Sequence, residues 1–122
     1  MAKIWVVDDS RLMCRYLERV LAGRHTIDEW QPTSAMDIAT YLLESAPDLV
    51  ITDYHMPGCN GATVARMVMK ARPGLPVIVI TVNREDEVAE TLRKFQVVEI
   101  LHKPVTAAAV LEAVDRALDV SA

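Results

Sequence analysis

Five residues that could carry chemistry follow apolar stretches of the chain. The set comprises Asp8 and Asp9 after "WVV", Asp53 at the end of "DLVITD", Thr81 at the end of "PVIVIT", and Lys103 shortly after "VVEIL". Two carboxylates about 4 Å apart repel each other by roughly 4 kcal/mol at an effective dielectric constant near 20. If the fold brings the three acids together, they therefore need a cation.

A divalent ion is the simplest partner for three carboxylates. Carboxylate and carbonyl oxygens are hard ligands, and no His/Cys cluster has metal-binding spacing, so Mg²⁺ or Mn²⁺ is favoured over Zn²⁺. With Lys103 nearby, such a site is close to neutral and could accept a phosphoryl group with its charge of about -2. Asp53 is the expected acceptor, because a carboxylate can act as a nucleophile and form an aspartyl-phosphate.

The elements that must bring these residues together are visible in the apolar pattern. Strand-like stretches occur at residues 3–7, 26–30, 48–53, 76–81 and 97–101, and helical spacing follows each of them. The first helical segment is expected to place Leu12, Met13 and Leu17 on one side, and Ser34 is the expected N-cap of the second. Five alternations predict a parallel sheet with helices on both faces, and residues 26–30, which are mixed in polarity, fit an edge strand. The reactive crevice of such a sheet lies beyond the carboxyl ends of its strands.

Length and composition narrow the class of protein. The chain has 122 residues, of which 52% are hydrophobic and 25% charged, so we expect one domain over residues 1–122 with no output domain. A net charge of -4 argues against a surface for nucleic acids. The chain shows neither a leader-like N-terminus nor a run of about 18 apolar residues, so we expect a cytoplasmic protein. The distant cysteines Cys14 and Cys59 are expected to be reduced and structural.

The sequence resembles the receiver domains of two-component response regulators, and in layout the single-domain chemotaxis type. The stretches that carry the resemblance are "VVDDS" (6–10), "VITDYHMPGCNG" (50–61), "VIVIT" (77–81) and "LHKP" (101–104). Their joint order covers essentially the whole chain. The resemblance implies an α/β, doubly wound (βα)5 flavodoxin-like fold, with a five-stranded parallel sheet in the order 2-1-3-4-5.

The resemblance also implies a role for each site residue. Asp53 would be phosphorylated, Asp9 would bind Mg²⁺ directly, and Asp8 would help directly or through water. The main-chain carbonyl of His55 would complete the protein ligands. Lys103 would pair with the phosphoryl oxygens, the hydroxyl of Thr81 would hydrogen-bond to one of them, and a cis peptide would precede Pro104.

A protein of this family would be a switch that phosphorylates and dephosphorylates itself, and not a turnover enzyme. Its phosphodonor would be a sensor histidine kinase or a histidine phosphotransfer protein. Phosphorylation would change its conformation and let it bind a downstream target protein. It would act as a monomer, or as a weak dimer through the face formed by the fourth helix, fifth strand and fifth helix.

Some residues depart from the family pattern near the expected switch. Ile100 stands where an aromatic residue is usual, Val82 where a small residue is usual, and Gln96-Val97 where Gly-Ala is usual. An alternative is therefore an interaction module with the receiver fold that does not use phosphorylation. A phosphohydrolase or a flavin carrier is disfavoured, because His55 replaces the second acid of the former and "DDSRLM" lacks the phosphate loop of the latter. The side chain of His55 could also tune the lifetime of the phosphoryl group.

Overall fold

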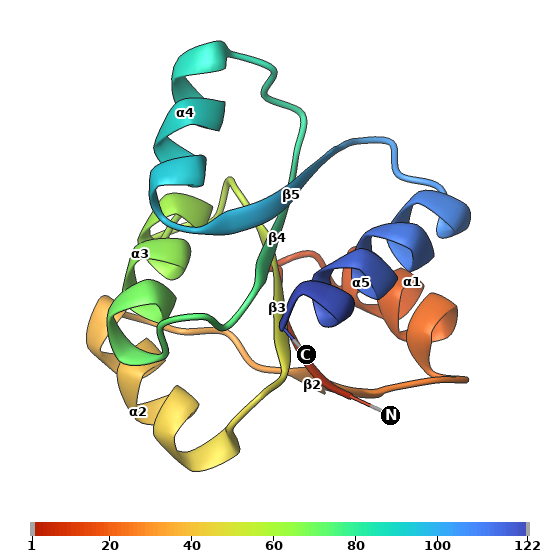
Figure 1. Cartoon of the computed structure of the whole chain (residues 1–122), viewed down its shortest axis with the longest axis horizontal. Coiled ribbons are helices and arrows are strands. Elements are labelled where there is room, and N and C mark those ends of the chain that lie inside the picture. The colour runs from red at the N-terminus through yellow and green to blue at the C-terminus, as the bar shows by residue number, and fades with distance from the viewer. Residues whose placement is uncertain (1, 122) are drawn as a thin grey trace.

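The computed structural model describes residues 2–121 and shows strands and helices in strict alternation. The strands are β1 (Lys3–Val7), β2 (Thr26–Glu29), β3 (Leu49–Asp53), β4 (Val77–Thr81) and β5 (Val97–His102). The helices are α1 (Arg11–Leu21), α2 (Ala35–Ser45), α3 (Gly61–Ala71), α4 (Asp86–Lys94) and α5 (Ala107–Ser121). Figure 1 shows this succession along the chain.

All five strands are parallel and their order is β2-β1-β3-β4-β5, which confirms the fold expected from the sequence. β2 lies at an edge, as its mixed polarity predicted, and β5 lies at the other edge. Val7 of β1 is the register partner of Thr52 of β3, so these two strands end side by side. The acids that follow them are therefore neighbours in space although 44 residues separate Asp9 from Asp53.

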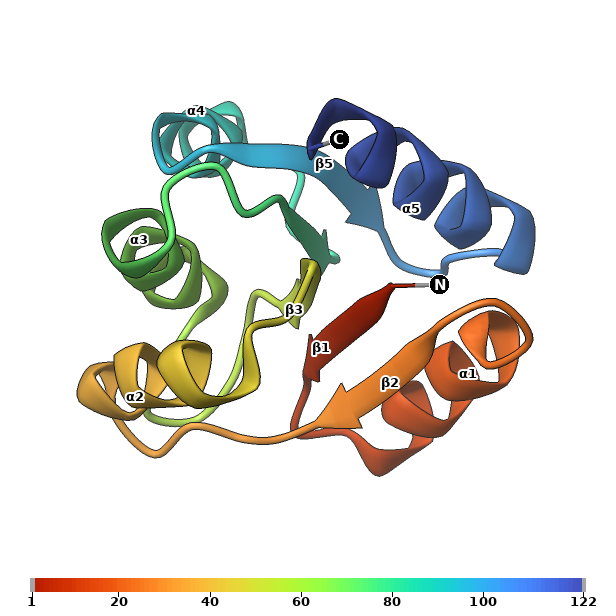
Figure 2. The same ribbon diagram turned by 60° about the horizontal axis from the view of Figure 1, so that its bottom comes forward.

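Two layers of helices cover the sheet. α1 and α5 pack on one face, where the core contains Leu17, Ile51 and Val114 among others. α2, α3 and α4 pack on the other face, around Leu42 and Val68. Figure 2 shows the sheet between these two layers. Since both faces are covered, the inner strands β1, β3 and β4 are apolar on both sides, and their polar residues stand at or next to their ends.

The helix starts follow local capping rules. The Ser10, Ser34 and Asn60 side chains accept hydrogen bonds from N–H groups in the first turns of α1, α2 and α3. The expected N-cap at Ser34 is thus confirmed. The expectation for Leu12 is wrong, because its side chain is 80% exposed. At 3.6 residues per turn, Leu12 lies on the opposite side of α1 from the buried Leu21.

Candidate functional site

Three carboxylates meet at the carboxyl edge of the sheet. Asp8 and Asp9 follow β1 and Asp53 ends β3, and one oxygen from each lies within 4.8 Å of the others. Asp8 and Asp53 are only 4% and 7% exposed, whereas Asp9 is exposed. The three acids that the sequence singled out therefore form one cluster that is closed on one side and open to solvent on the other.

The environment of Asp8 disfavours its charged form. Burial raises the pKa of Asp8 to about 6, and the negative charges of Asp53 and Asp9 add to the rise. The Ser10 N–H, which donates to Asp8 Oδ1 at 2.9 Å, and the positive charge of Lys103 act in the opposite direction. The cluster thus holds more negative charge than its own surroundings neutralise.

Lys103 supplies the one cation that contacts the acceptor candidate within the described part of the chain. Its Nζ lies 3.1 Å from Asp53 Oδ1, and the N–H of Tyr54 donates to the same oxygen at 3.0 Å. The main-chain N–H of Lys103 donates to the carbonyl of Thr81 at 3.0 Å, which ties the end of β5 to the end of β4. The Lys103–Pro104 peptide is cis, as the family resemblance implied.

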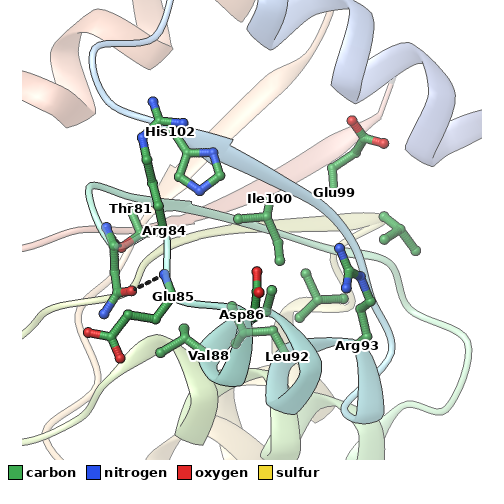
Figure 3. A pocket seen from close by; sticks show the side chains of 14 residues that line it. Thr81, Arg84, Glu85, Asp86, Val88, Leu92, Arg93, Glu99, Ile100 and His102 are labelled. Carbon is green, nitrogen blue, oxygen red and sulfur yellow. Dashed lines mark hydrogen bonds between the residues drawn. The ribbon is translucent and has the colours of Figure 1, made fainter.

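Thr81 ends β4 and is buried. Its hydroxyl oxygen accepts the N–H of Asn83 at 3.0 Å. A cavity of about 400 Å³ opens between α4 and β5, and Thr81, Leu92 and Ile100 are among its lining residues (Figure 3). The aliphatic Ile100 thus faces free space next to Thr81, at the position where an aromatic residue was missing from the sequence pattern.

Two residues at the mouth of the site are exposed. His55 lies on the loop after β3, and its ring meets the ring of Tyr54 edge-on at a centroid distance of 4.9 Å. Val82, directly after Thr81, is 63% exposed. His55 thus lies two residues after Asp53, and Val82 directly after Thr81, on the loops that leave the carboxyl edge of the sheet.

Two further residues shape the site and were missed in the sequence. Gly61, the first residue of α3, lies against the main chain of Asp53 and Tyr54: a Cβ atom there would be 2.8 Å from the Asp53 carbonyl oxygen. Gln31, in the loop after β2, donates from its amide to the main-chain carbonyl of Asp8. The Asn60-Gly61 pair was a visible signal of a tight helix start, but nothing in the local sequence marked Gln31.

The donor set of the cluster fits a hard divalent cation. All three side chains offer oxygen, and those of Asp8 and Asp53 are buried. Lys103 lies at one end of the cluster, against Asp53. Carboxylate oxygens are the ligands that Mg²⁺ takes in phosphate-handling sites. Three negative charges against the one positive charge of Lys103 leave about two charges for such an ion to balance.

Fold and site together define a doubly wound α/β domain with its polar residues gathered at the carboxyl edge of the sheet. The chain belongs to the family described as the response regulator receiver domain, whose family model matches residues 4–115. Response regulators of this family act in two-component signalling.

Known proteins of similar sequence are consistent with this family. The DNA-binding transcriptional regulator NtrC of Escherichia coli K12 is 29% identical over 115 residues, which cover 94% of this chain and 24% of that protein. The response regulator GacA of Pseudomonas aeruginosa is 33% identical over 87 residues, which cover 70% of this chain and 41% of that protein. The chain therefore spans less than half the length of these curated relatives.

A solved structure supports the fold over almost the full length. A response regulator receiver domain protein from Clostridium thermocellum superposes with a TM-score of 0.84 at 28% identity, covering 98% of this chain and 95% of that one. Among the helices that the structure describes, none is long and apolar enough to cross a membrane.

Proposed function

We propose that this protein accepts a phosphoryl group on Asp53 in a Mg²⁺-dependent reaction. The observation that carries the proposal is the 3.1 Å contact between Lys103 Nζ and Asp53 Oδ1, at the edge of a cluster of three carboxylates. A lone buried acid paired with a lysine would be a structural ion pair. Two more acids in the same pocket would destabilise the fold unless the site serves a charged ligand.

Each residue has a part in this chemistry. A carboxylate oxygen of Asp53 attacks the phosphorus of a phosphohistidine, the P–N bond breaks, and the imidazole leaves. The ammonium group of Lys103 moves its contact from the Asp53 oxygen to a phosphoryl oxygen. The hydroxyl of Thr81 donates a hydrogen bond to another phosphoryl oxygen. Asp8, Asp9, Asp53 and the carbonyl of His55 would hold Mg²⁺, which when bound supplies positive charge for the phosphoryl oxygens.

The proposal extends to partners and setting. The phosphodonor would be a sensor histidine kinase or a histidine phosphotransfer protein, and the phosphorylated form would bind a downstream target. We propose a receiver in the cytoplasm that switches itself and turns over no separate substrate. The free, buried thiols of Cys14 and Cys59 fit a reducing compartment. A monomer, or a weak dimer through α4, β5 and α5, is the proposed assembly.

Acetyl phosphate with Mg²⁺ tests the acceptor directly. Intact-mass spectrometry should show one phosphoryl adduct on the parent protein and none on Asp53→Asn. Asp119→Asn, which changes an exposed acid on α5, is the matched control and should be modified like the parent. Modification of Asp53→Asn to the level of the parent would refute the assignment.

A second candidate is an interaction module that has the fold but does not use phosphorylation. Its support is Ile100, an aliphatic residue that lines the cavity beside Thr81 and has no aromatic ring to turn inward. Beryllofluoride with Mg²⁺ separates the two candidates. Amide chemical shifts that move along β4, α4 and β5 support a switch, whereas unchanged spectra together with no adduct support the second candidate.

A further inference from the structure

The main-chain carbonyl of Asp8 is held by two side chains from different parts of the fold. Asp8 lies past the last register pair of β1 with β3, so its carbonyl is outside the strand ladder. The Gln31 amide donates to it from the loop after β2, and the Cys14 thiol donates to it from α1 at 3.3 Å. Because this carbonyl belongs to the peptide that joins Asp8 to Asp9, the two bonds fix the plane from which both carboxylates project.

The position of Gln31 is itself fixed by its neighbour Trp30. The indole N–H of the buried Trp5 donates to the Trp30 carbonyl at 2.9 Å, and the Trp30 ring stacks on Tyr41 with centroids 4.7 Å apart and planes 1° apart. The hydroxyl of Tyr41 in turn donates to a carboxylate oxygen of Asp28. These contacts anchor the chain directly before Gln31 to β1, β2 and α2, so the exposed glutamine does not extend from a free loop.

Gln31 and Asp9 line two cavities in common. It lines a cavity of about 140 Å³ together with Asp9 and Met56, and a cavity of about 400 Å³ together with Asp9 and Arg15. Gln31 and the exposed Asp9 therefore border the same two cavities next to the acidic cluster.

We propose that Gln31 is a positioning residue of the acidic site. Its amide clamps the Asp8–Asp9 peptide so that the exposed Asp9 carboxylate stays directed at the Asp53 carboxylate, and the Trp5, Trp30 and Tyr41 rings keep the clamp in place. The proposal rests on the metal site of the proposed function, since its consequence is a cation site assembled before the cation arrives. Groups that orient metal ligands typically change metal affinity by about 10- to 100-fold when removed.

Titration calorimetry with Mg²⁺ alone tests the clamp without phosphorylation. Gln31→Leu keeps much of the side-chain volume but has no donor, and it should weaken Mg²⁺ binding by about tenfold. Gln96→Leu replaces the other exposed glutamine, before β5, and should bind as the parent does. Urea unfolding in Mg²⁺-free buffer should give the same midpoint for Gln31→Leu and the parent, which separates positioning from general destabilisation.

A double variant shows whether the two donors act on the same carbonyl. If they do, the losses of Mg²⁺ affinity in Gln31→Leu and Cys14→Ala will not add in the combined variant. Parent-like Mg²⁺ affinity of Gln31→Leu overturns the positioning role. If instead the parent and Asp9→Asn do not differ in Mg²⁺ binding, the metal site of the proposed function itself is wrong.

Discussion

Replacing Gly61 by alanine tests how closely α3 approaches the main chain of the acceptor candidate. A Cβ atom on Gly61 would lie 2.8 Å from the Asp53 carbonyl oxygen and 2.9 Å from the Tyr54 Cα. The N–H of Gly61 also donates to the Tyr54 carbonyl at 2.8 Å, so α3 cannot simply tilt away. Both opposing atoms belong to the main chain, which cannot move aside by rotating a side chain.

The size of the effect follows from this geometry. Restoring an ordinary contact of about 3.4 Å requires the main chain to shift by roughly 0.6 Å, and overpacking of this kind typically costs about 1–3 kcal/mol. Alanine also restricts the unfolded chain, which stabilises a protein by about 0.4–1 kcal/mol where the new side chain fits. We therefore expect Gly61→Ala to lower the free energy of unfolding by about 1–2 kcal/mol.

Gly23→Ala is the matched control, because a Cβ atom there meets nothing within 4 Å. Urea unfolding followed by circular dichroism should show Gly23→Ala at or above the stability of the parent, and Gly61→Ala below it. The displaced Asp53 main chain should also slow modification by acetyl phosphate in Gly61→Ala alone. If both glycine variants unfold at the same urea concentration as the parent, the close approach of α3 to Asp53 is refuted.

Two further predictions concern charge and backbone conformation. Because burial raises the pKa of Asp8 from 3.8 to about 6, the folded carboxyl holds its proton more tightly than the unfolded one, and this residue lowers stability as the pH rises through that range. In Mg²⁺-free buffer near pH 7.5, urea unfolding should show that Asp8→Asn is more stable than the parent by up to about 3 kcal/mol. This gain in stability should disappear near pH 4. Equal stability of the two proteins at both pH values would contradict the prediction. Ala46 caps α2 with a positive φ of 46°, whereas Ala22 caps α1 with a φ of -62°. Ala46→Gly should therefore stabilise the protein by about 1 kcal/mol and Ala22→Gly destabilise it by about 0.5–1 kcal/mol in the same assay, and effects of the same sign would be evidence against the αL cap.

The fold was predictable because its signals are local and repeated. The strands are stretches of four to six residues, apolar except for the mixed edge strand β2, and each helix begins near a polar cap, so their order along the chain could be derived from periodicity. The boundaries shifted slightly, as β2 ends at Glu29 and β5 extends to His102. Trp30, expected in the second strand, lies directly after it, and its ring packs against the rings of Trp5 and Tyr41.

The features that were missed depend on contacts between distant segments. Leu12 has the spacing of a buried residue, but the face that α1 buries is decided by how the helix sits on the sheet. The bond from Gln31 to Asp8 depends on the register of β2 against β1 and on the packing of Trp30. Gln96 adopts a positive φ of 64° directly before β5, although its residue type does not favour that conformation.

The sequence by itself determined which chemical groups stand at the end of each strand, because parallel strands with covered faces carry polar residues only at their ends. It therefore determined that three acids, a threonine and a lysine share one edge of the sheet. Only the tertiary structure decided that Lys103 lies 3.1 Å from Asp53 and that Asp8 is buried while its neighbour Asp9 is exposed. Burial and distance are set by what α1, β3 and the loop after β2 place around each carboxylate, and no residue specifies those neighbours alone.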